Sequence, residues 1–215
     1  MKTVEFGKQN NDVIMLLHGG GLSWWNYKAE AELLKDQYHV VLPILDGHAG
    51  SDNDFISIEK NASRLISFVD KKFGGSVLLI GGLSLGAQIL VEMLTQQNTI
   101  CQNAVIESAS VIPSKLTNAL IKPMFSLSYG LVKMKCFAQM QFDYLHIRKD
   151  LFEDYYRDTS QISKENMIAF LEANTSYEIK PGLQDVHAKV HILVGEKEQK
   201  KMICSAEQLH KALPG

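Results

Sequence analysis

A glycine–serine–glycine motif between a strand pattern and a helix pattern constrains this chain most. The motif, GLSLG, occupies Gly82–Gly86 and has Ser84 at its centre. Before it, Val77–Gly82 is an aliphatic run typical of a buried strand, and after it apolar residues recur at helical spacing over Gly86–Gln96. A sharp turn between two such elements needs glycines, because the neighbouring backbones pass too close for a Cβ atom. This context predicts that Ser84 projects from the turn as the nucleophile of an enzyme.

Apolar runs alternate with helical patterns through most of the chain, which predicts the α/β class with a mostly parallel, doubly wound sheet. Strands are expected at Val13–Leu17, Tyr38–Pro43, Val77–Gly82, Asn103–Glu107 and Val190–Val194. Helices are expected at Tyr27–Lys35, Ile58–Phe73, Gly86–Gln96 and Ile203–Ala212. A short N-terminal strand near Lys2–Phe6 is expected to pair with Val13–Leu17.

The segment 111–181 breaks this alternation. It has no clear strand, its apolar residues fall mostly at helical spacing, and three prolines divide it. We expect several short helices that form a cap, inserted into an α/β core made of residues 1–110 and 182–215. The methionines and phenylalanines of the cap either line an apolar substrate pocket or hold the cap helices together.

Composition and charge narrow the classes of partner. The chain is 46% hydrophobic, has a net charge of −2 and lacks a dense basic run, so we expect no nucleic acid partner. No apolar run is long enough for stable membrane insertion. We interpret Lys122, Lys133 and Lys135 of the cap as a solvated face rather than as contacts to anionic lipid. Three widely spaced cysteines predict reduced thiols and a cytoplasmic location.

A serine nucleophile needs a general base, a group that orients the base, and donors for the oxyanion. The segment His18–Gly21, with sequence HGGG, follows the expected strand Val13–Leu17, so its backbone N–H groups can face the turn at Ser84. We expect the oxyanion donors to be the amide of Gly20 or Gly21 and that of Leu85. We interpret His18 itself as structural.

Three segments together resemble the α/β-hydrolase superfamily, particularly its compact capped esterases and acyl hydrolases. They are HGGGLSWW at 18–25, DGHAGS at 46–51 and the Ser84 motif, and the likeness covers the whole chain apart from the cap. The resemblance implies an α/β-hydrolase fold, Ser84 as nucleophile, a small-molecule acyl substrate, and no metal or organic cofactor. It also implies that His48 holds its loop in shape.

The resemblance places the acid of the triad after the strand Val190–Val194, where Glu198 matches the position of the family's acid. Glu196 and Glu107 are the alternatives. Trp24 and Trp25 follow the oxyanion segment, where aromatic residues shape the mouth of the pocket in the family. Packing of both indoles into the core is the alternative.

No histidine matches the family's general base, which lies on a loop after one further strand. His187 and His191 precede the acid, His210 lies on the helix Ile203–Ala212, and His39 and His146 have no supporting context. We therefore expect a C-terminally truncated chain, with the histidine beyond its last residue.

The prediction is a serine hydrolase that cleaves a carboxylic ester or thioester through an acyl-enzyme on Ser84, impaired as it stands by the missing histidine. One alternative is a carbon–carbon bond hydrolase on the same frame. The other is a ligand-binding relative that has lost catalysis. The sequence leaves the oligomeric state open.

Overall fold

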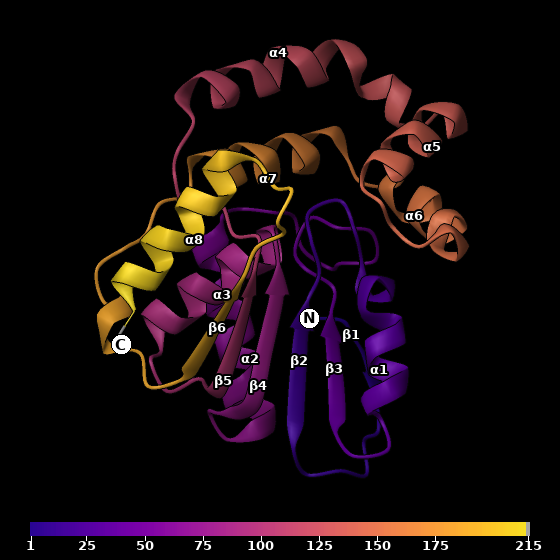
Figure 1. Ribbon diagram of the computed structural model, residues 1–215. Coiled ribbons are helices and arrows are strands. Elements are labelled where there is room, and N and C mark those ends of the chain that lie inside the picture. The colour runs from indigo at the N-terminus through magenta and orange to yellow at the C-terminus, as the bar shows by residue number, and fades with distance from the viewer. Residues whose placement is uncertain (214–215) are drawn as a thin grey trace.

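In the computed structural model, which describes residues 1–213, a six-stranded sheet lies between helices (Figure 1). The strands are β1 (Thr3–Phe6), β2 (Val13–Leu17), β3 (His39–Pro43), β4 (Val77–Leu83), β5 (Cys101–Glu107) and β6 (Lys189–Leu193). The helices are α1 (Lys28–Leu34), α2 (Ile58–Phe73), α3 (Leu85–Gln96), α4 (Lys115–Val132), α5 (Lys135–Tyr144), α6 (Phe152–Thr159), α7 (Lys164–Ser176) and α8 (Lys200–Ala212).

The strands follow the order β1-β3-β2-β4-β5-β6, and every neighbouring pair is parallel except β1 with β3. The predicted α/β class with a mostly parallel sheet is therefore confirmed. The expected pairing of the N-terminal strand with Val13–Leu17 is wrong, since β1 pairs with β3, with Thr3 opposite Pro43. The reason is that β3 and β4 already occupy both edges of β2.

Helices α2, α3 and α8 lie on one face of the sheet and α1 lies on the other (Figure 1). Every residue from Leu85 to Leu94 in α3 is buried. Only Gln88 and Glu92 in this stretch are polar and both are buried, so the helix is covered on its apolar and its polar sides alike. The helix that begins at the Ser84 turn is thus held by the sheet, by α2 and by α7.

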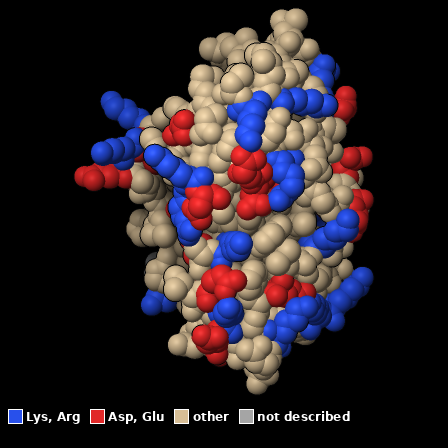
Figure 2. Space-filling model, turned by 90° about the vertical axis from the view of Figure 1, so that its right-hand side faces the viewer, with Lys and Arg blue, Asp and Glu red and all other residues tan. Residues whose placement is uncertain are grey.

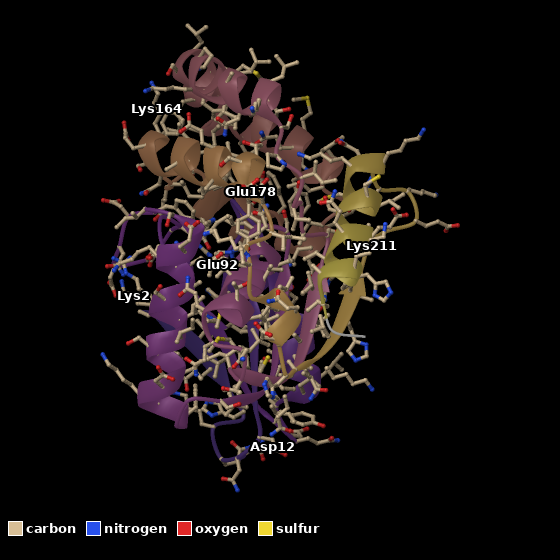
Figure 3. The ribbon with its side chains drawn as sticks, turned by 90° about the vertical axis from the view of Figure 1, so that its left-hand side faces the viewer. Lys2, Asp12, Glu92, Lys164, Glu178 and Lys211 are labelled. Carbon is tan, nitrogen blue, oxygen red and sulfur yellow. The ribbon has the colours of Figure 1, made fainter. Side chains whose placement is uncertain are left out.

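The segment between β5 and β6 carries α4 to α7 and lies above the carboxyl ends of the strands (Figure 1). The boundaries 111–181 remain a prediction, and all four helices fall within them. The end of this cap is fastened to the core through Glu92 of α3, a buried side chain beside α2 (Figure 3). Its carboxylate accepts a hydrogen bond from the Tyr177 hydroxyl (3.3 Å) and pairs with Lys180 (3.3 Å), which also pairs with Glu59.

Strand β6 forms one edge of the sheet, and its residues alternate between exposed and half-buried. Cys101 is buried, Cys136 and Cys204 are exposed, and all three thiols are free. No helix within residues 1–213 combines the length and the apolar character that crossing a bilayer requires.

Candidate active site

Ser84 lies in a strained turn between β4 and α3. Its backbone has φ 51° and ψ −110°, a conformation that side-chain-bearing residues rarely adopt and that proteins retain mainly where function requires it. The turn is held on both sides: Ser84 N–H donates to Glu107 O (2.8 Å), and Ser84 O accepts from Gln88 N–H (3.0 Å). The half-buried serine is therefore fixed above the carboxyl edge of the sheet.

Two glycines of the motif are required by close approach. A Cβ atom on Gly82 would lie 2.5 Å from Gly86 O, inside van der Waals contact. A Cβ atom on Gly86 would overlap Leu17 O and lie 2.6 Å from His18 O. The start of α3 thus packs directly against the end of β2, where the HGGG segment begins.

The two expected oxyanion segments are neighbours. A Cβ atom on Gly20 would lie 3.5 Å from Leu85 Cδ2, so Gly20 borders the first residue of α3. Leu85 N–H belongs to the first turn of that helix, whose amides have no partner within the helix. The Gly21 N–H donates to His48 Nε2 (3.0 Å) and is occupied. Of the two alternatives, the geometry favours Gly20.

His18 and His48 are neutral and hold loops. His18 Nδ1 contacts Gly19 O (2.9 Å) and its Nε2 accepts from Leu45 N–H (3.1 Å), while His48 Nδ1 contacts Asp46 O (3.1 Å). Burial lowers the pKa of His48 to about 4 and lowers that of His18 well below its usual value. With both ring nitrogens engaged by the backbone, neither ring has a nitrogen available for Ser84.

Glu198 lies at the same edge of the sheet as Ser84. Its Oε1 accepts a hydrogen bond from the Ser108 hydroxyl (3.1 Å), and Ser108 directly follows Glu107, whose carbonyl binds the Ser84 amide. Ser108 is itself anchored, because its N–H donates to Leu193 O at the end of β6 (2.9 Å).

The two alternative acids have different surroundings. Glu196 is exposed. Burial raises the pKa of Glu107, and the nearby carboxylate of Glu30 on α1 raises it further. Within residues 1–213, no histidine ring forms a hydrogen bond with Ser84 or with any of the three candidate acids.

A cavity of about 490 Å³ lies between the HGGG segment and the cap. Gly20 and Gly21 form its floor, and the side chains around it are almost all apolar. They are Phe125, Val132, Phe137, Met140, Gln141, Tyr144, Leu145, Tyr155, Thr159, Met167, Phe170 and Leu171. Among residues 1–213, no Lys, Arg, Asp or Glu lines the cavity, which therefore suits an uncharged group.

Neither tryptophan lines this cavity, so the expectation that Trp24 and Trp25 shape it is not met. Trp25 is fully buried, and its indole N–H donates to Asp158 Oδ2 of α6 (2.8 Å). Trp24 packs between that cluster and the sheet. Trp25 is thus a core residue that also joins the core to the cap, as the alternative expected for both indoles, whereas Trp24 is only half-buried.

Two cap residues that no sequence motif indicates support the oxyanion segment. The Thr159 hydroxyl donates to Gly21 O (3.0 Å), across 138 positions of the chain. The ring of Phe170 stacks on His48 with centroids 4.8 Å apart and also lines the cavity. No local pattern identifies either residue, because both contacts depend on where the cap folds back.

Comparison with known proteins identifies the family of this chain. The family model described as "Alpha/beta hydrolase family" matches residues 14–211, whereas no curated protein sequence matches the chain. An enol-lactonase from Burkholderia xenovorans LB400 has a similar structure, with a TM-score of 0.80, 15% identity, and coverage of 99% of this chain and 84% of that one.

Two further solved structures are similar. An esterase from Thermogutta terrifontis has a TM-score of 0.78 and 15% identity, covering 99% of this chain and 81% of the other. A putative alpha/beta hydrolase family protein from Desulfitobacterium hafniense has a TM-score of 0.75 and 23% identity, with coverage of 99% and 86%. At these identities the structures show a shared fold, and the family match adds the assignment: the chain belongs to the alpha/beta hydrolase family.

Proposed function

We propose that this protein is a serine hydrolase that cleaves a carboxylic ester or thioester with a small to medium apolar acyl group. Ser84 Oγ attacks the carbonyl carbon, and its proton passes to a general base. The leaving group takes up that proton, and water then hydrolyses the acyl-enzyme. The amides of Gly20 and Leu85 stabilise the negative oxygen of each tetrahedral intermediate.

The observation that carries this proposal is the strained backbone of Ser84 between β4 and α3. Strain of this kind is stored where a side chain must be held in one place. The two close-approach glycines and the neighbouring Gly20 segment surround the same serine. A structural turn has no need for this combination.

We propose Glu198 as the acid that orients the base, with Glu107 and Glu196 as alternatives. The hydrogen bond from Ser108 keeps the Glu198 carboxylate at the edge where Ser84 projects. Glu107 fits this role less well, because within residues 1–213 no side chain donates a hydrogen bond to its carboxylate and holds it in one place. None of the described histidines is proposed as the base.

The apolar cavity supports an uncharged acyl or alkyl group as the part of the substrate that is recognised. Its volume falls within the range of small-molecule sites. The lactonase and esterase neighbours act on compounds of the ester class by their names. Their low identity leaves the substrate of this protein to experiment.

A fluorophosphonate probe tests the nucleophile. We expect mass spectrometry of the labelled protein to find the adduct on the peptide that contains Ser84. The Ser84→Ala variant should lose it, whereas Ser176→Ala, at the exposed end of α7, should keep it. Circular dichroism checks that each variant is folded. Absence of an adduct on Ser84 in the folded wild-type protein contradicts the proposal.

A ligand-binding protein without catalysis is the second candidate, and one observation favours it: no described histidine is hydrogen bonded to Ser84. Aryl esters of increasing acyl length separate the two. Turnover that Ser84→Ala abolishes supports the hydrolase, while saturable binding without turnover in both proteins supports the binding protein. Turnover of β-diketones but not of aryl esters identifies a carbon–carbon bond hydrolase instead.

A further inference from the structure

The outer face of α4 is an exposed apolar stripe. Its inner face packs into the cap through Ile121, Phe125 and Val132, so the helix has apolar residues on two opposite sides. The outer stripe continues through the short α4–α5 junction and consists of Leu116, Leu120, Met124, Leu127, Leu131 and Met134. Leu127 is 92% exposed and Leu116 is 76% exposed, so nothing in the described chain covers them.

A row of lysines lies on another side of α4, about 100° or more around the helix axis from the nearest residue of the stripe. Lys115, Lys122 and Lys133 are separated by seven and eleven residues, which are about two and three helical turns, so they project along one line of α4. All three are exposed and form no ion pair within residues 1–213. The lysine row therefore keeps its positive charge unneutralised.

Carboxylates are absent from the same part of the chain. Between Glu107 and Asp143 the sequence has no aspartate or glutamate. In Figure 2 the uppermost part of the molecule, where the cap lies, is largely tan, and blue and red side chains lie below it. A solvated helix face normally carries both signs of charge and few large apolar side chains, so solvation does not explain this surface.

We propose that the stripe and the lysine row form a docking surface for an anionic phospholipid membrane. Helix α4 lies in the plane of the interface, with the leucines and methionines among the acyl chains and the lysines at the level of the phosphates. This interpretation replaces the solvated face that the sequence favoured for Lys122 and Lys133. Lys135 is not part of the row, because it pairs with Glu153 (2.7 Å).

Charge complementarity favours lipid over a second copy of the chain. A membrane rich in anionic lipid supplies negative charge, and each lysine near such a surface contributes about 1 kcal/mol, or roughly fivefold in binding. A second copy of α4 brings more lysines and no carboxylate to the contact, and like charges brought together oppose association.

The docking surface lies next to the cavity. Met140 and Tyr144 of α5 and Leu145, which directly follows it, are exposed and also line the cavity, so the cavity wall reaches the protein surface at the helix that follows α4. Phe125 and Val132 on the inner face of α4 line the same cavity. Docking through α4 therefore brings the mouth of an apolar cavity close to a source of apolar molecules.

Vesicle flotation tests the proposal on the full chain. We expect the wild-type protein to float with vesicles of phosphatidylcholine mixed with phosphatidylglycerol, to bind weakly to phosphatidylcholine alone, and to dissociate as salt rises. Leu127→Ser should weaken binding about tenfold. Lys122→Gln combined with Lys133→Gln should weaken vesicle binding about 30-fold, because each lysine contributes roughly fivefold.

Matched control variants distinguish docking through α4 from nonspecific binding to vesicles. Leu33→Ser removes another highly exposed leucine from α1, and Lys71→Gln with Lys211→Gln removes the same charge from α2 and α8. These controls, and Ser84→Ala, should bind vesicles as the wild type does, so the result does not depend on hydrolysis. Equal loss in the α4 variants and the controls overturns the proposal. So does a lack of flotation, or a concentration-dependent dimer that Leu127→Ser abolishes.

Discussion

The packing of Gly86 against the end of β2 leads to a prediction about Gly86→Ala. The same substitution at Gly130 serves as a control and should have the opposite effect on stability. Gly86→Ala adds a single methyl group at the start of α3, where it overlaps Leu17 O and lies 2.6 Å from His18 O. Both contacts are backbone atoms of a buried strand end, so no side chain can turn aside to make room. The same substitution at Gly130, in α4, places the methyl group in open space.

The two substitutions should change the free energy of unfolding in opposite directions. Overpacking in a buried region costs about 1–3 kcal/mol, and the Gly86 contact belongs at the upper end, because α3 and the strand must separate. Gly130→Ala should stabilise by about 0.5–1 kcal/mol, since alanine loses less backbone entropy than glycine in a helix. For a chain of this length, about 3 kcal/mol corresponds to a fall of about 6–12 °C in Tm.

Thermal and urea unfolding followed by circular dichroism measure both effects. Fluorophosphonate labelling of Ser84 adds a second readout, because displacement of α3 moves the Leu85 amide away from Gly20. We expect Gly86→Ala to lose both stability and labelling, and Gly130→Ala to lose neither. A Tm for Gly86→Ala within about 1 °C of wild type would refute the close approach of α3 to β2.

Two further predictions concern buried polar contacts. Burial opposes ionisation of Glu5, but hydrogen bonds from Lys72, Thr3 and His39 outweigh it and lower the pKa of Glu5 from 4.5 to about 2. Glu5 should therefore stabilise the protein above about pH 4.5 and lose this effect as the pH falls toward 2. In urea titrations at neutral pH, the free energy of unfolding of the wild type should exceed that of Glu5→Gln by about 1–2 kcal/mol, a figure that already allows for the exposure of Lys72. This difference should shrink as the pH falls. A difference that does not change with pH contradicts the prediction. Trp25→Phe should cost about 2–4 kcal/mol in urea unfolding, because it removes the hydrogen bond to buried Asp158, whereas Trp24→Phe should cost less than about 1 kcal/mol.

The elements near the Ser84 motif could be predicted from local pattern alone. Strand β4 is a continuous apolar run and helix α3 has apolar residues at helical spacing, and the expected bounds differ from the observed ones by a single residue at each changed end. The partner of β1 could not be predicted in this way. Strand pairing depends on which edges remain free once the sheet forms, and β2 has none.

Some features of the candidate site could likewise be predicted from local sequence, and others could not. Motif chemistry identified Ser84 and the HGGG segment, since a strained turn and a close backbone approach both leave glycines in the sequence. The choice between Gly20 and Gly21 required the fold, because the His48 ring that occupies the Gly21 amide is 27 positions away. The positions of the two tryptophans also required it, because an indole suits a buried core and a pocket mouth equally well.

The sequence by itself determined the α/β class, the Ser84 turn and the presence of a helical insertion, because these follow from side-chain periodicity and local backbone sterics. Only the tertiary structure decided which residues line the cavity and which face of α4 stays uncovered. Helical spacing places Leu127 and Phe125 on different sides of one helix, but it does not say which side meets the protein. That depends on contacts with α7 and the core, and these leave Leu127 in solvent and Phe125 at the cavity.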